Sequence, residues 1–182
     1  LLGSGSAAAV AGVKAYMEKN NVPGTIRYYG CPAEENAGGK AFLVRDGFFD
    51  DCDIAICWHP NQFNMVSAGG SLANFRVFYT FHGTSAHAAG SPHLGRSALD
   101  AVELMNIGVQ FLREHMIDDA RIHYAIIDTG GYSPNVVQPT ASVLYLIRSP
   151  RNDQVDGLYE RVNKIAQGAA LMTETQLEID FV

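Results

Sequence analysis

The chain has 182 residues, of which 47% are hydrophobic and only 18% are charged, and this composition excludes intrinsic disorder as the main state. Acidic residues outnumber basic ones by 19 to 13, and the resulting net charge of −6 argues against a nucleic-acid partner. No apolar run approaches the ~20 residues of a membrane-spanning helix, so we expect no membrane partner either.

The chain contains three cysteines and opens without an initiator methionine. Three cysteines give no disulfide framework and fit a reducing compartment, so we expect a cytoplasmic protein. The chain begins on a helix-like apolar segment and closes on an alternating strand pattern. We therefore expect an internal fragment of a longer protein.

Residues 1–67 predict the alternating helices and strands of an α/β sheet. A segment of small residues predicts a helix over residues 7–20, and the β-rich segment 25–29 predicts a strand. A short helix is expected over residues 37–45, and the apolar run 54–57 is typical of a buried parallel strand. This order predicts part of a parallel α/β domain.

Residues 68–182 predict a different and complete domain. Alternating apolar residues predict four strands, and apolar residues at helical spacing predict two helices. The expected strands cover 75–81, 122–126, 143–147 and 177–181, and the expected helices cover 96–115 and 155–169. The order β-α-β-β-α-β predicts a ferredoxin-like sheet with both helices on one face.

Acidic and imidazole side chains follow the two predicted strands of the first half. Glu34 and Glu35 come after segment 25–29, and His59 comes directly after segment 54–57. Because carboxyl ends of neighbouring parallel strands meet at one sheet edge, these side chains predict a site for Zn²⁺ or Mn²⁺. A second carboxylate there could take a proton from metal-bound water.

Two simpler interpretations of these residues stay open. The acidic pair could only stabilise the N-terminus of the following helix, and His59 could be an ordinary loop residue. Alternatively Cys31 could be a nucleophile with His59 as its base, although neighbouring carboxylates would raise the pKa of the thiol.

The second half has its own candidate residues. His87 lies in a loop of small residues, residues 83–90, which leaves its side chain free to project. Asn135 precedes the third predicted strand, and Arg148 ends it. Arginine grips carboxylates through two parallel hydrogen bonds. A turn histidine and a solvated arginine at the sheet edge are the alternatives.

Five segments in this order resemble the M20 family of metallopeptidases and amidohydrolases. They are residues 30–35, 58–60, 87–93, 135–139 and 147–148. The resemblance implies that Glu34 is the general base and that Glu35 and His59 are ligands of a two-metal site containing Mn or Zn.

The resemblance also implies roles for the second half. His87 would reach the active site of a partner subunit and polarise the scissile carbonyl, while Asn135 and Arg148 would hold the carboxylate end of the substrate. Residues 1–67 would be part of the catalytic domain, and residues 68–182 the lid and dimerisation domain. The partner would be a second copy or a related subunit.

The implied reaction is hydrolysis of an amide between an acyl or aryl group and an amino acid. The family's other metal ligands have no counterpart in this chain, so we expect the fragment alone to bind metal poorly and to be inactive. The alternative is a non-catalytic interaction module or a regulatory paralogue. The presence of Glu34, Glu35 and His59 argues against such a loss of catalysis.

Overall fold

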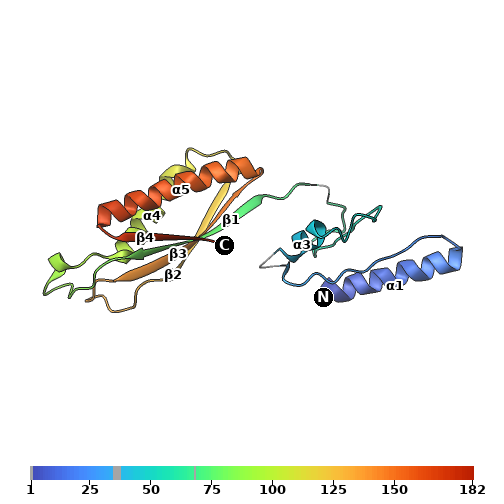
Figure 1. The fold of residues 1–182 in the computed structure, drawn as a ribbon, viewed down its shortest axis with the longest axis horizontal. Helices are drawn as coiled ribbons and strands as arrows, with labels where there is room; N and C mark the ends of the chain where they lie inside the picture. Colours follow the sequence, from blue (N-terminus) through green and yellow to red (C-terminus); the bar gives the residue numbers. More distant parts are fainter. Residues whose placement is uncertain (1, 35–37, 68) are drawn as a thin grey trace. The chain divides into compact units, whose positions relative to one another are not determined.

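The structure is a computed structural model that describes residues 2–34, 38–67 and 69–182. The chain divides into two units, residues 1–67 and residues 68–182 (Figure 1). In the described ranges, no helix has the length and apolar character needed to cross a membrane.

The second unit has the order β-α-β-β-α-β that its sequence pattern predicts. Its elements are β1 (Ala73–His82), α4 (Ala98–Arg113), β2 (Arg121–Asp128), β3 (Thr140–Ser149), α5 (Asn152–Thr173) and β4 (Gln176–Phe181). All strand pairs are antiparallel and the sheet order is β2-β3-β1-β4, so β2 and β4 are the edges. The predicted ferredoxin-like fold of this unit is confirmed.

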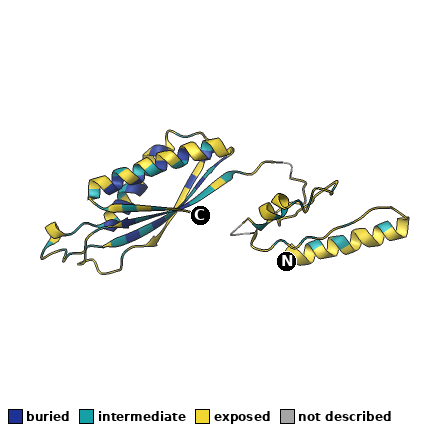
Figure 2. Cartoon of the chain, viewed as in Figure 1, coloured by how far each residue is buried: buried dark blue, intermediate teal, exposed yellow. Residues whose placement is uncertain are grey.

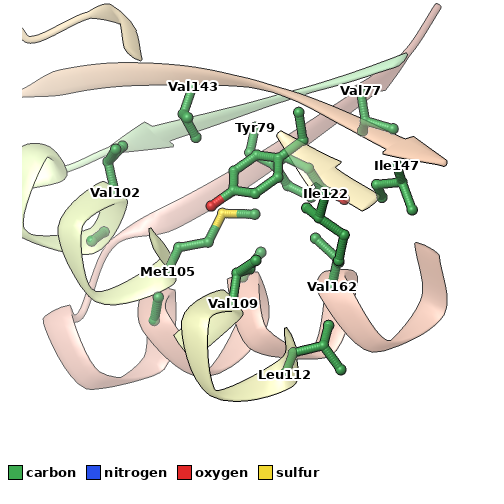
Figure 3. Close-up of a cluster of buried hydrophobic side chains, with 14 of the residues drawn as sticks. Val77, Tyr79, Val102, Met105, Val109, Leu112, Ile122, Val143, Ile147 and Val162 are labelled. Atoms are coloured by element: carbon green, nitrogen blue, oxygen red, sulfur yellow. The ribbon is translucent and has the colours of Figure 1, made fainter. Parts of the chain in front are cut away.

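Both helices pack on the same face of this sheet, which explains the alternation in the strands. Every second residue of β3 is buried, and the residues between them face the other side. In Figure 2, the residues coloured as buried lie in the helices and strands of the second unit. In Figure 3, Met105 and Val109 of α4 point toward Tyr79 of β1. The core therefore lies between two layers, and the second sheet face stays open.

The two helices approach each other closely at Gly108. A Cβ atom at this position would lie 2.6 Å from the side chain of Ile165 on α5. Real carbon atoms do not come so close, so any larger residue would push the helices apart. Gly108 thus allows α4 and α5 to share the same sheet face.

Two buried tyrosines keep their hydroxyl groups satisfied inside the core. Tyr145 donates to Oδ1 of Asn106 at 2.5 Å, and Tyr79 donates to Oδ1 of Asn163 at 2.7 Å. Burial raises the pKa of both tyrosines well above the ordinary value, so the hydroxyls remain protonated donors. The bonds connect the central strands to both helices.

The first unit contains helices α1 (Leu2–Asn20) and α3 (Gly39–Arg45), and its described residues form no strand. The strands predicted over residues 25–29 and 54–57 are therefore wrong for this structure. Ile54 is 76% exposed and Ile56 is 90% exposed. A strand needs hydrogen-bonded neighbours, and neither segment has one among the described residues.

A tryptophan ties the end of the first unit to its beginning. The indole N–H of Trp58 donates to the carbonyl oxygen of Leu2 at 3.1 Å and to Oγ of Ser6 at 2.9 Å. A Cβ atom on Gly5 would lie 2.6 Å from the indole ring, so glycine is needed for this contact. Since α1 has no buried residue, such local contacts replace a packed core.

We predict that Tyr145→Phe lowers the free energy of unfolding of the second unit by about 1–3 kcal/mol, because Asn106 loses its buried partner. Tyr124→Phe is the matched control, since the Tyr124 ring stacks on Tyr145 but its hydroxyl makes no hydrogen bond with any described residue. Urea unfolding followed by circular dichroism measures both variants. Equal losses in the two would contradict the prediction.

Candidate functional site

Glu34 lies at the surface of the first unit. Its carboxylate forms an ion pair with Nζ of Lys40, at 3.1 Å, in the first turn of α3. The cap position of α3 is Gly38, and no side chain caps this helix. Glu34 thus contacts the helix through a lysine rather than through its free N–H groups, and its carboxylate stays accessible to solvent. Glu35 lies outside the described residues.

His59 is exposed, and one of its ring nitrogens is already engaged. Nδ1 lies 2.9 Å from the carbonyl oxygen of Pro60, which can only accept, so Nδ1 carries the ring proton. This leaves the lone pair of Nε2 free. A histidine that donates through one nitrogen and offers the other is the usual form of a metal ligand.

The described residues contain no group of three or more His, Cys, Asp or Glu side chains placed to hold a metal ion. His59 has the right tautomer for one ligand, but the predicted partner ligand, Glu35, lies outside the described ranges. The pairing of Glu35 with His59 therefore stays a prediction, and so does the position of Glu34 beside a metal.

His87 in the second unit is held in the opposite tautomer. Its Nδ1 accepts hydrogen bonds from the backbone N–H groups of Gly90, at 2.9 Å, and Ala89, at 3.3 Å. Backbone N–H groups can only donate, so Nδ1 is unprotonated and the ring proton sits on Nε2. The loop therefore presents an N–H donor at the outer end of the imidazole.

The structure brings His87 and Asn135 together, although they are 48 positions apart in the sequence. The N–H of Ala88 donates to the carbonyl oxygen of Asn135 at 2.9 Å, and the N–H of Val137 donates to that of Ala86 at 2.9 Å. His87 and Val136 form an isolated antiparallel bridge. The two loops thus form one backbone-paired structure that carries both predicted residues.

Arg148 lies elsewhere on the lid, near the far end of β3. Asn135 precedes the first residue of β3, Thr140, whereas Arg148 is the second-last residue of that strand. A rise of about 3.3 Å per residue separates Thr140 from Arg148 by roughly 26 Å. Within one copy of the second unit, Asn135 and Arg148 thus lie beyond and near opposite ends of β3, and their shared role at the carboxylate end of the substrate stays a prediction.

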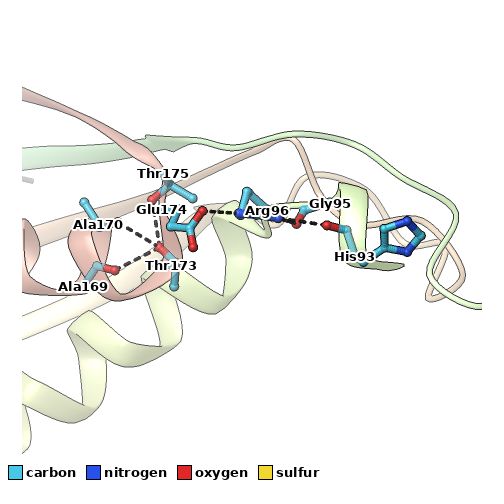
Figure 4. Close-up of polar contacts among 8 residues, drawn as sticks. All are labelled: His93, Gly95, Arg96, Ala169, Ala170, Thr173, Glu174 and Thr175. Carbon is cyan, nitrogen blue, oxygen red and sulfur yellow. Dashed lines mark hydrogen bonds and ion pairs between the residues drawn. The ribbon is translucent and has the colours of Figure 1, made fainter. Parts of the chain in front are cut away.

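Sequence reasoning missed the residue that anchors the His87 loop. Arg96 donates to the carbonyl oxygens of Gly95, at 2.7 Å, and His93, at 3.2 Å, and its Nε contacts Oε2 of Glu174 at 2.8 Å (Figure 4). The backbone of Arg96 also pairs with Thr84 in both directions. No local signal in the sequence links Arg96 to Glu174.

Glu174 itself has an unusual backbone conformation for its residue type. It ends α5 with a φ of 54°, in the left-handed region that glycine usually occupies. Its backbone N–H donates to Leu171, and the N–H of Thr175 donates to Ala170. These backbone hydrogen bonds fix the position of Glu174, and its carboxylate forms the ion pair with Arg96.

The second unit matches a known family of dimerisation domains. A family model for the M20 peptidase dimerisation domain covers residues 70–173, so the chain belongs to the M20 family. That range coincides with most of the second unit.

Curated relatives match the chain over nearly its whole length. It is 55% identical over 181 residues to one subunit of the p-aminobenzoyl-glutamate hydrolase of Escherichia coli K12, covering 100% of the chain and 38% of that protein. It is 31% identical to the Xaa-Arg dipeptidase of Mus musculus, covering 95% of the chain and 40% of that protein. The chain thus spans about two fifths of the length of these relatives.

Solved structures agree with the fold. The aminobenzoyl-glutamate utilization protein from Klebsiella pneumoniae matches with a TM-score of 0.54 and 26% identity, covering 60% of this chain and 28% of that one. A putative amidohydrolase/peptidase from Burkholderia cenocepacia matches with a TM-score of 0.56 and 24% identity over 60% of this chain and 27% of that one. The resemblance to the M20 family seen in the sequence is confirmed.

We predict that Arg96→Ala increases amide hydrogen exchange in residues 84–95 by about 3- to 10-fold, because the loop loses its side-chain anchor. Arg151→Ala is the control, since Arg151 forms a similar exposed pair with Asp153 at the opposite end of α5. Mass spectrometry of both variants gives the measurement. Unchanged exchange in Arg96→Ala would show that backbone pairing alone holds the loop.

Proposed function

We propose that the chain is part of a metal-dependent amidohydrolase that cleaves the amide between an acyl or aryl group and an amino acid, with aminobenzoyl-glutamate-like substrates. The observation that carries the proposal is the 55% identity, over the whole chain, to a subunit of p-aminobenzoyl-glutamate hydrolase. In this proposal residues 1–67 belong to the catalytic domain, and residues 68–182 form the lid and dimerisation domain.

The first unit supplies the acid–base chemistry of the proposed reaction. Divalent metal ions, Mn or Zn in a two-metal site, would lower the pKa of a bound water. Glu35 and His59 are the proposed ligands, and the free Nε2 of His59 supports its assignment. Glu34 accepts the proton of the water and later returns it to the leaving amine. Its carboxylate, which pairs with Lys40 and is accessible to solvent, supports this role.

The second unit supplies a hydrogen-bond donor for the carbonyl oxygen. His87 presents Nε2–H outward because its Nδ1 already accepts from Gly90 and Ala89. A fixed donor aimed at the oxygen stabilises the negative charge that develops there in the transition state. Asn135 lies in the loop paired with that of His87, so both side chains serve one end of the substrate site.

Two copies of the lid are required if one substrate contacts all the proposed residues. His87 and Asn135 lie at one end of the sheet, and Arg148 lies near the other end of β3. The stretch of β3 from Thr140 to Arg148 alone is roughly 26 Å long, which is more than a small amide can span. We propose that His87 and Asn135 act in the partner subunit's site, while Arg148 serves the site of its own subunit.

The proposed dimer contact is the edge strand β2 together with α4. Two exposed apolar residues of β2, Tyr124 and Ile126, lie on the helix side of this edge and define the β2 patch. Arg113 of α4 donates to the carbonyl oxygen of Ile122, which joins the helix to the edge strand. Pairing of two β2 strands would continue the sheet across the dimer and cover the patch.

We predict that, in a full-length protein carrying these residues, Glu34→Gln abolishes measurable amide hydrolysis but retains bound metal. His59→Ala lowers the metal content, and His87→Ala lowers kcat by roughly 10²–10³. His93→Gln, in the same loop as His87, is the control and keeps its activity. Hydrolysis of N-(4-aminobenzoyl)glutamate and elemental analysis give the readouts; full activity in Glu34→Gln would exclude the proposed base.

Complementation between the two impaired variants tests whether one active site contains residues from both subunits. A mixed dimer of Glu34→Gln and His87→Ala subunits contains one site in which both side chains are intact, if His87 serves the partner. Co-expression should therefore raise hydrolysis well above the level that either variant shows alone. Failure of mixed dimers to regain activity would place His87 in the site of its own subunit.

We predict that the 182-residue chain is dimeric and that Ile126→Glu weakens its dimerisation at least about 10-fold, because a carboxylate would be buried without a partner. Leu171→Glu is the control, since Leu171 is also an exposed apolar residue but lies in the last turn of α5 rather than on β2. Analytical ultracentrifugation of each chain alone, and mixed with a related subunit, distinguishes a homodimer from a heteromer.

A further inference from the structure

Three arginines lie side by side on the open face of the lid sheet. Arg121 of β2 is directly opposite Arg148 of β3 in the strand register. Arg148 is opposite Asn74 of β1, and Arg76 follows two residues later on the same face. Cβ atoms of opposed residues lie about 5 Å apart, and diagonal neighbours about 7 Å. The three guanidinium groups thus come from neighbouring positions on three adjacent strands.

None of these arginines has an acidic partner among the described residues. The ion pairs of the described chain involve other side chains, and Arg121 donates only to the backbone carbonyls of Asp118 and Ala120. The Nε atoms of Arg76 and Arg148 are buried and lack a hydrogen-bond partner in the structure. Buried donors without acceptors and opposed like charges both destabilise a fold.

An aromatic ring lies beside the guanidinium of Arg76. The guanidinium carbon lies over the Phe78 ring, 5.6 Å from the ring centroid. Asp180 of the edge strand β4 is opposite Phe78, but it forms no ion pair with Arg76 in the described chain. Glu178 pairs with His82, at the opposite end of β1. The arginine end of the open face thus has no carboxylate in contact with it.

We propose that Arg76, Arg121 and Arg148 form one site for the two carboxylates of an acidic amino acid in amide linkage. Arg148 lies between the other two, on the central strand β3, so it contacts both carboxylates, with Arg121 holding one from β2 and Arg76 holding the other from β1. This inference rests on the proposed function for the identity of the ligand, and it adds Arg76 and Arg121 as residues that select acidic over neutral amino acids. Planar guanidinium groups bind carboxylates through paired, charge-assisted hydrogen bonds, which a neutral side chain cannot form.

The spacing of the cluster favours two carboxylates over one. A single carboxylate has two oxygens and is satisfied by one guanidinium in bidentate geometry. Three guanidinium groups on adjacent strands would leave two of them unpaired around such a ligand. A dicarboxylate with a short carbon chain between its charges matches the spacing between opposed strands of about 5 Å. Glutamate has this form.

Kinetics of the full-length protein test the selection. The probes are N-benzoyl-glutamate and N-benzoyl-alanine, which differ in one carboxylate. Arg121→Gln and Arg76→Gln should each lower kcat/KM for the glutamate compound by roughly 10- to 100-fold through KM, and should leave the alanine compound unchanged. Lys164→Gln removes the same charge from the exposed side of α5 and should change neither. Equal losses on both substrates would overturn the proposal.

A direct binding measurement tests the arginine site without requiring that the protein hydrolyse the ligand. Nuclear magnetic resonance titration of the 182-residue chain with N-benzoyl-glutamate should shift the amide signals of Arg76, Arg121 and Arg148. N-benzoyl-alanine should bind at least about 10-fold more weakly. Binding without any hydrolysis by the full-length protein would refute the proposed function and keep the site. Sulfate that binds as tightly as the dicarboxylate would instead show a general anion site and overturn the assignment.

Discussion

The packing of α4 and α5 on a single face of the lid sheet is the constraint on which the rest of the molecule depends. It gathers the inward-facing apolar side chains of the strands into one layer against the helices (Figure 3). Because Tyr79 and Tyr145 satisfy their hydroxyls within that layer, the central strands are fixed to both helices. The loops at the sheet ends can then hold His87 in a defined orientation.

The sequence predicts this lid well because the information is local. Strand alternation and helical spacing are properties of neighbouring residues, and a one-sided sheet makes them regular. In the first unit, local sequence patterns do not predict the strands correctly. Segments 25–29 and 54–57 are apolar and β-rich, but a strand also depends on neighbouring strands, which local composition does not report. Ile54 and Ile56 belong to such a segment, yet both are exposed and neither lies in a strand of the described structure.

The features of the candidate site also differ in whether the sequence alone predicts them. His87 and Asn135 can be found from loop composition, and Glu34 and His59 from their places after apolar segments. The tautomers of His59 and His87 cannot be predicted from the sequence, because each depends on backbone atoms that only the folded loop brings into position. Arg96 escapes detection because its partner Glu174 lies 78 residues away, and the arginine cluster appears only once the strand register is known.

The two sheet edges differ in chemistry, and this difference limits how copies can associate. The edge strand β2 carries the exposed Tyr124 and Ile126, whereas β4 carries Glu178 and Asp180 on the open face. Like charges brought together across two β4 strands repel each other, and such edges resist pairing. In the proposed dimer, joining two copies through β2 would occupy the edge of each copy that can pair and would leave only the acidic edges outward. Growth of the sheet by repeated addition would then stop at two copies, and the paired sheet would not become a template for fibres.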